Sequence, residues 1–177
     1  MDWPTQISRM AYVKCKINEA DIQNIWPYHL PEVAATKIQL LEVEQCLEKF
    51  ADPLYFNFLS YANGWKGIYQ YVDLFGTVDL IVSPLMSYAK GLLDAIEDSY
   101  FDQKNITRNS VLPIATTLID KDLFVIGAKG TSIEGQVIWL AGEEIDRFPN
   151  FEQFFLAMVD YNIEEFNDLN FLNIKPT

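Results

Sequence analysis

Two aspartates, Asp73 and Asp79, stand on either side of the short segment Phe75-Gly76-Thr77. If the chain turns at Gly76, the two carboxylates come close enough to bind a hard cation or to share acid–base chemistry. The competing interpretation is that each carboxylate accepts hydrogen bonds from nearby backbone N–H groups and so caps the turn. We favour turn-capping and keep the pair as the best candidate for chemistry.

Side chains that commonly serve as nucleophiles or general bases are scarce. His29, in the segment WPYHLP, is the single histidine, and a lone histidine beside aromatic and proline residues is more often a loop or packing residue than a general base. Cys46 falls on the apolar side of a predicted helix, so we expect a small buried hydrophobe rather than a reactive thiolate. The role of Cys15 stays open. Both thiols are expected to be free, because a chain with an adequate core gains little from one bridge.

The spacing of residues supports neither a zinc site nor a nucleotide site. One histidine and two scattered cysteines give no pattern of zinc ligands. Gly127, Gly130 and Gly135 fit neither G-x-G-x-x-G nor a P-loop, and no Lys-Ser pair follows them. We therefore expect no catalytic residues, no cofactor and no metal.

Acidic residues dominate the charge of the chain. Thirteen basic against 25 acidic residues give a formal net charge of −12, which repels phosphate backbones and attracts cationic partners, so nucleic-acid binding is not expected. The acids gather in two groups: Asp94, Glu97, Asp98 and Asp102 on the solvent side of a predicted helix, and a run that begins with Glu143, Glu144 and Asp146 and continues to Asp168. Two interpretations stay open: solvated faces that keep the protein soluble, or a field that attracts a basic protein partner.

Length and hydropathy indicate one folded domain. The 177 residues suffice for a single core, and a content of 50% hydrophobic and 14% aromatic residues is too apolar for a disordered chain. The longest apolar runs, Leu123 to Ala128 and Phe154 to Val159, are far shorter than the roughly 18 to 20 residues that cross a bilayer. An acid and a proline stand where a secretory signal would carry basic residues and an apolar core. We expect a cytoplasmic protein with no membrane segment.

Capping residues and apolar periodicity predict helices in the first half of the chain. From about Glu32 to Phe50 apolar residues recur at three- and four-residue spacing. Asp52-Pro53 then provides an N-cap and a first helical residue for a helix that ends at Asn63-Gly64, where Gly64 suits a left-handed terminus. Ser83-Pro84 opens a third helix, whose apolar spacing continues to Tyr100.

Strand signals follow these helices and alternate with turns. Gly67 to Leu80 is expected as a strand followed by a turn. Three short apolar runs, Val111 to Ala115, Leu123 to Gly127 and Gln136 to Leu140, are separated by polar segments and indicate meandering antiparallel strands. Strands and helices are grouped rather than strictly alternating. This favours an α+β fold with a mainly antiparallel sheet flanked by helices.

The two ends of the chain give weaker signals. Asn150 caps a last helix, with a glutamine three residues later in the capping-box position. The first thirty or so residues alternate weakly and contain Pro4, Pro27 and Pro31, which predicts a short strand or coil packed on the domain. No clear period is found after Asp168.

Taken in order, three stretches resemble the SMI1/KNR4 (SUKH) family. The family's opening pattern, a helix, a Pro-started helix ending in Asn-Gly and a strand into a DLFGT-type stretch, is similar to residues 47–80, LEKFADPLYFNFLSYANGWKGIYQYVDLFGTVDL. Its PI strand and hairpin resemble residues 112–130, LPIATTLIDKDLFVIGAKG. Its Trp-bearing strand and closing helix resemble residues 136–160, QVIWLAGEEIDRFPNFEQFFLAMVD. The resemblance depends on the order of the three stretches rather than on any one of them. One departure is Asp52-Pro53, which stands where the family usually has Leu-Pro before the second helix.

This resemblance divides the chain into an N-terminal extension over residues 1–31, an SMI1/KNR4-like domain over residues 32–168 and a C-terminal tail over residues 169–177. It implies an α+β fold without a conserved catalytic constellation. Bacterial members are commonly immunity proteins (antitoxins) that neutralise toxins, often nucleases, and fungal members act as regulatory binding proteins. The resemblance thus implies a domain that binds a cognate, basic protein toxin, or else a regulatory scaffold similar to the fungal cell-wall-synthesis regulators. An enzyme would need His29, Asp73 and Asp79 to converge in a closed pocket.

We make separate predictions for four residues in the stretches that resemble the family. Asn63 and Gly64 are assigned to a structural motif, and Trp139 is assigned to core packing. Trp65 either covers the edge of the core or anchors a partner. The candidate partner contacts are therefore Trp65 and the acids Asp94, Glu97, Asp98, Asp102, Glu143, Glu144 and Asp146.

Overall fold

Short apolar runs of the chain pair into one antiparallel sheet, as the spacing of the strand signals predicts. The computed structural model describes residues 1–104 and 106–174. The sheet has the strand order β1-β2-β3-β4-β5-β6, and every neighbouring pair is antiparallel. Its strands are β1 (Trp65–Tyr69), β2 (Val72–Leu74), β3 (Val111–Thr116), β4 (Leu123–Gly127), β5 (Val137–Leu140) and β6 (Glu144–Phe148).

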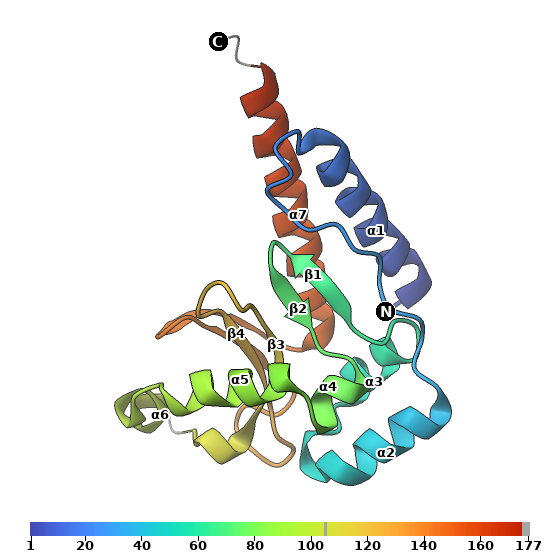
Figure 1. The fold of residues 1–177 in the computed structure, drawn as a ribbon. Coiled ribbons are helices and arrows are strands. Elements are labelled where there is room, and N and C mark those ends of the chain that lie inside the picture. Colours follow the sequence, from blue (N-terminus) through green and yellow to red (C-terminus); the bar gives the residue numbers. More distant parts are fainter. Residues whose placement is uncertain (105, 175–177) are drawn as a thin grey trace.

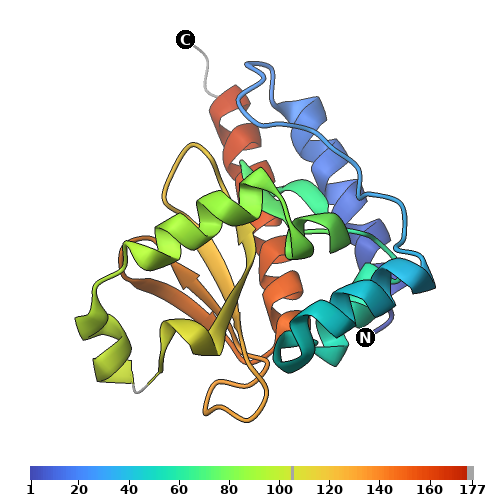
Figure 2. The same ribbon diagram turned by 60° about the horizontal axis from the view of Figure 1, so that its bottom comes forward.

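Helices cover both faces of this sheet (Figures 1 and 2). The α-helices are α1 (Trp3–Ala20), α2 (Lys37–Leu47), α3 (Pro53–Leu59), α4 (Thr77–Ile81), α5 (Pro84–Asp94), α6 (Asp98–Lys104) and α7 (Phe151–Ile174). Helix α5 lies on one face against β3 and β4, and α7 lies on the other face. Every residue of β3 and β4 is buried, which explains why these strands are continuous apolar runs. The α+β fold with a helix-flanked antiparallel sheet is therefore confirmed.

Predicted helix starts agree with the structure where a local cap defines them. The Asp52 carboxylate accepts hydrogen bonds from the N–H groups of Leu54 and Tyr55 at the start of α3. Ser83 Oγ accepts from Met86 N (2.9 Å) at the start of α5, and Asn150 Oδ1 accepts from the third residue of α7 (3.0 Å). These bonds span three residues or fewer, so a local sequence pattern suffices to predict them.

The expectation of a short strand or coil at the N-terminus was wrong, because residues 3–20 form the helix α1. Asp2 caps it, and Pro4 stands in its first turn, where a missing N–H does no harm. Trp3, Met10 and Ile17 are buried along one side of α1, which lies beside α7 over most of its length (Figure 1). Helix α1 is thus stabilised by tertiary packing rather than by a strong local pattern.

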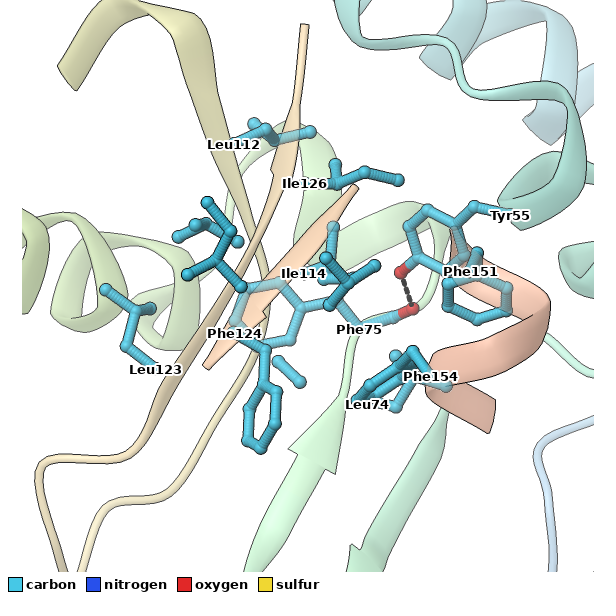
Figure 3. Packing of buried hydrophobic residues seen from close by; sticks show 14 of the residues in the cluster. Tyr55, Leu74, Phe75, Leu112, Ile114, Leu123, Phe124, Ile126, Phe151 and Phe154 are labelled. Atoms are coloured by element: carbon cyan, nitrogen blue, oxygen red, sulfur yellow. Dashed lines mark hydrogen bonds between the residues drawn. The ribbon is translucent and has the colours of Figure 1, made fainter. Parts of the chain in front are cut away.

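Aromatic rings join these layers into one core. Trp3 makes edge-to-face contacts with Phe58 of α3 (5.2 Å between ring centroids) and Phe155 of α7 (5.3 Å). The buried Tyr55 hydroxyl donates a 2.6 Å hydrogen bond to the carbonyl oxygen of Phe75, next to the ring of Phe151 (Figure 3). The first helix of the expected N-terminal extension therefore contributes to the main core.

Several other element boundaries differ from the expectations. The helix expected from Glu32 begins only at Lys37, after a Thr36–Gln39 capping box. The helix opened by Ser83 ends at Asp94, and α6 begins separately at Asp98. Strand β6 was not predicted, because charged residues occupy most of it. Helix α7 continues past Asp168 to Ile174, and residues 175–177 of the expected tail lie outside the described residues.

None of the helices in the described ranges is both long enough and apolar enough to span a membrane.

Candidate functional site

The two most distinctive sequence segments, around Asn63-Gly64 and Phe75-Gly76-Thr77, lie against each other. The Asn63 side chain accepts a hydrogen bond from Thr77 N (2.8 Å) and donates one to Thr77 Oγ1 (3.0 Å). Gly64 has φ +93°, as expected for a left-handed position, although α3 already ends at Leu59. A Cβ on Gly64 would lie 2.7 Å from Gly76 N. The pair Asn63-Gly64 is therefore structural, as predicted, and it fixes the position of α4.

A cavity of about 370 Å³ opens beside this junction. One wall is the segment that precedes α2, which contributes Glu32 and Val33, and the opposite wall is α4, which contributes Val78 and Asp79. Backbone hydrogen bonds from Glu32 N to Gly64 O (3.1 Å) and from Asn63 N to Glu32 O (3.3 Å) hold the first wall in place. We refer to this cavity as the groove.

Asp73 and Asp79 both line the groove, and the charge of Asp79 acts on the Asp73 carboxyl. Each also caps backbone as we favoured: Asp73 Oδ1 accepts from Gly67 N (2.8 Å) and Asp79 Oδ2 accepts from Gly76 N (3.2 Å). Burial raises the pKa of Asp73. The Gly67 hydrogen bond and the nearby cations oppose this shift, and the negative charge of Asp79 adds to it.

His29 does not complete an acid–base site with these aspartates. It lies near enough to Asp73 to influence the pKa of that carboxyl, but it is exposed and does not belong to the residues that line the groove. Its backbone carbonyl accepts a hydrogen bond from Trp65 Nε1 (3.0 Å). Within the described residues no group of three or more His, Cys, Asp or Glu side chains is placed to hold a metal ion.

Trp65 lies in the core and Trp139 packs against it. Trp65 is fully buried, so the interpretation as a partner anchor gives way to the alternative that it covers the core. Trp139 is half-buried and stacks on Phe124 (5.1 Å between centroids), while its Nε1 donates to Asp122 (2.8 Å). The assignment of Trp139 to packing agrees with these contacts.

The two acidic groups that the sequence separates by about forty residues meet on one side of the protein. Glu97 of the first group and Glu143 and Glu144 of the second line a common surface depression of about 340 Å³. Tyr100 and Lys104 of α6 connect the groups, since the Tyr100 hydroxyl donates to Glu144 (2.9 Å) and Lys104 Nζ lies 3.3 Å from the same carboxylate. We call this combined surface the acidic face.

Some of the candidate partner contacts on this face serve the fold instead. Glu144 binds the guanidinium of Arg147 through two 2.9 Å hydrogen bonds, which hold the pKa of Glu144 at about 2. Asp146 accepts a hydrogen bond from the hydroxyl of Tyr161 (3.0 Å). The pKa of Tyr161 is raised to about 12, mainly by burial and to a lesser extent by this hydrogen bond. Glu144 on the acidic face and Asp146, which contacts α7, are thus both held by internal bonds.

Asp98 is likewise held by an internal contact. It pairs with Arg108, whose guanidinium also donates to the carbonyl oxygens of Leu93 and Ile96. The exposed carboxylates of the expected set that have no ion pair within the described residues are Asp94, Glu97, Asp102 and Glu143.

The cysteines are free thiols, as expected, but one assignment was wrong. Cys46 is exposed because α2 lies on the surface and buries only Val43 fully, so the side of α2 that carries Cys46 faces solvent. Cys15 is half-buried and its Sγ donates to Glu19 (3.6 Å).

Comparison with known proteins adds no relative: no protein-family model matches the chain, and a search of curated proteins finds no match.

Proposed function

We propose that this chain is a non-enzymatic protein-binding domain of the SMI1/KNR4 (SUKH) type that acts as an immunity protein, neutralising a cognate bacterial toxin by direct binding. The observation that carries the proposal is the acidic face, where two groups of acids distant in sequence converge and leave carboxylates directed at solvent. A net charge of −12 gives this face a negative background. Such a field accelerates encounter with a basic partner, and nuclease toxins are basic because they approach phosphates.

The arrangement of the candidate catalytic side chains supports binding over catalysis. Asp73 and Asp79 each use one oxygen to cap backbone, and His29, although near Asp73, is exposed and does not line the groove. A general base needs a substrate proton within hydrogen-bond reach and usually a third group that orients it. Within the described residues both aspartates are bonded to backbone N–H groups, and no third ionisable side chain is hydrogen-bonded to either carboxylate.

Growth rescue is the direct test. A candidate toxin domain, taken from a large open reading frame beside this protein's gene, is expressed in a bacterial host with and without this chain, and the purified pair is analysed by size-exclusion chromatography. We expect rescue together with a stable complex. Absence of both would overturn the proposal. A complex that leaves toxicity unchanged would also overturn it and would be the behaviour of a regulatory scaffold.

Charge reversal tests the role of the acidic face. Glu97 and Glu143 are exposed and have no ion pair within the described residues, so both can be changed to lysine without breaking the Glu144 network. The matched control reverses Glu42 and Glu44, which are exposed on α2, lie outside both acidic groups and give the same change in net charge. We expect the acidic-face variant to associate about tenfold more slowly at low salt, with a smaller effect in the control. Equal association rates in both variants would refute electrostatic attraction by this face.

A further inference from the structure

The groove beside α4 is a preformed recess with firmly held walls. Backbone bonds between Glu32 and the residues Asn63 and Gly64 hold one wall, and the Asn63–Thr77 pair holds the start of α4 on the other. Because these bonds exist in the isolated protein, a ligand that enters need not order the site first. At about 370 Å³ the groove lies near the lower end of the roughly 300–1,000 Å³ range of small-molecule pockets, which suits one or two side chains.

Apolar side chains flank the mouth of the groove and are unusually exposed. Val33 on one wall is 88% exposed and Val78 on the other is 65% exposed. Two exposed β-branched residues facing one recess form an apolar rim, the kind of surface that marks interaction sites. Leu85, half-buried behind them, extends the apolar lining inward.

Charge inside the groove is predominantly negative. Glu32, Asp73 and Asp79 line it, with Lys66 as the one cation among the lining residues; His29 lies near Asp73. The second oxygens of Asp73 and Asp79 have no hydrogen-bond donor from the described residues. Within the described residues no group of three or more such side chains is placed to hold a metal ion, and the negative charge of the groove suits a cationic side chain.

We propose that the groove is an anchor site for an arginine of the protein partner, presented between apolar residues. Its guanidinium supplies several planar donors to the free carboxylate oxygens, and its alkyl stem lies along Val33 and Val78. This inference rests on the proposed function for the identity of the partner as a toxin. The groove and the acidic face have different roles. An arginine anchored in the groove slows dissociation of the complex, whereas the long-range charge of the acidic face accelerates its association.

Matched variants test the anchor with a toxin domain that forms a complex with this protein in the growth-rescue experiment. Val78→Asp and Glu32→Gln alter the groove, whereas Leu118→Asp and Glu42→Gln make comparable changes on surfaces outside the groove and the acidic face; Leu118 is as exposed as Val78 at 65%. Dissociation rates are measured by surface plasmon resonance after circular dichroism has established that each variant is folded. We expect Val78→Asp to dissociate at least tenfold faster and Glu32→Gln severalfold faster, with both controls within about twofold of the wild type. Groove variants that dissociate like their controls would overturn the proposal.

A short probe tests the groove independently of any toxin. The tripeptide acetyl-Leu-Arg-Val-amide is titrated into the ¹⁵N-labelled wild-type protein, and acetyl-Leu-citrulline-Val-amide is the neutral control of the same shape. We expect the arginine peptide alone to shift the amide signals of Gly64, Lys66 and Gly76, and expect Val33→Ser to reduce the shifts. If neither peptide shifts them, or both do so equally, the cationic anchor is refuted. If wild-type protein fails to bind the toxin while the arginine peptide still binds here, the proposed function fails and the groove assignment stands.

Discussion

Replacing Gly64 by alanine should destabilise the protein through two separate effects. Gly64 has φ +93°, where a residue with a Cβ is strained by about 1–3 kcal/mol. The added Cβ would also lie 2.7 Å from Gly76 N and 2.8 Å from Leu74 O, and forcing such a contact costs about another 1–3 kcal/mol. The expected loss of unfolding free energy is therefore about 2–6 kcal/mol. At roughly 2–4 °C per kcal/mol for a chain of this size, the melting temperature should fall by about 10 °C.

Three other glycines separate the two effects. Gly76→Ala introduces only the contact, since φ is −93° and the Cβ would lie 2.3 Å from Asn63 O. Gly130→Ala introduces only the strain, because φ is +76° and nothing lies within 4 Å of the new Cβ. Gly91→Ala introduces neither, and in the helix α5 it should stabilise by about 0.5–1 kcal/mol.

Urea denaturation at 25 °C followed by circular dichroism gives the unfolding free energy of each variant, and m values establish whether the unfolded state has changed. The unfolding free energy lost in Gly64→Ala should be about equal to the sum of the losses in Gly76→Ala and Gly130→Ala. A loss no larger than that of Gly130→Ala would refute the close approach of the two segments. Full stability combined with lost partner binding would instead assign Gly64 to a direct contact.

The remaining predictions concern two buried or bonded charges. The Arg147 bonds hold the pKa of Glu144 at about 2, below the 4.5 of a free glutamate, so its contribution to stability is complete above about pH 4.5 and disappears as the pH falls toward 2. Glu144→Gln should therefore lower the free energy of unfolding by on the order of 1 kcal/mol at pH 7, after allowance for solvent screening. In urea titrations the unfolding free energies of the variant and the wild type should become equal near pH 2. A difference between them that does not depend on pH would contradict this reasoning. Burial lowers the pKa of Lys14 from 10.5 to about 8 against the opposing charge of Glu165, so wild-type stability should rise between about pH 8 and pH 10.5, where only the unfolded chain carries this proton. Lys14→Met should be more stable than the wild type by about 1–3 kcal/mol at pH 7. Its melting temperature should not rise between about pH 8 and pH 10.5 as that of the wild type does. If the variant shows the same rise in melting temperature, Lys14 is not its cause.

Local patterns in the sequence determined several elements of this protein. Asp52-Pro53, Ser83-Pro84 and Asn150 each begin a helix where predicted, because a cap needs only hydrogen bonds to residues two or three positions away. The runs that became β3, β4 and β5 were also predicted correctly, since residues buried on both faces of a sheet must be apolar. The antiparallel sheet of an α+β fold followed from the grouping of these signals.

Only the tertiary structure decided which surface each residue faces. Trp65 is buried and Cys46 exposed because their burial depends on segments distant in sequence, and no local period carries that information. Glu144 and Glu143 are neighbours in sequence, yet Arg147 and Tyr100 hold the first while the second faces solvent. The groove exists because the segment at Glu32 pairs with Asn63-Gly64 across thirty residues, and hydrogen bonds of that range arise from the fold as a whole.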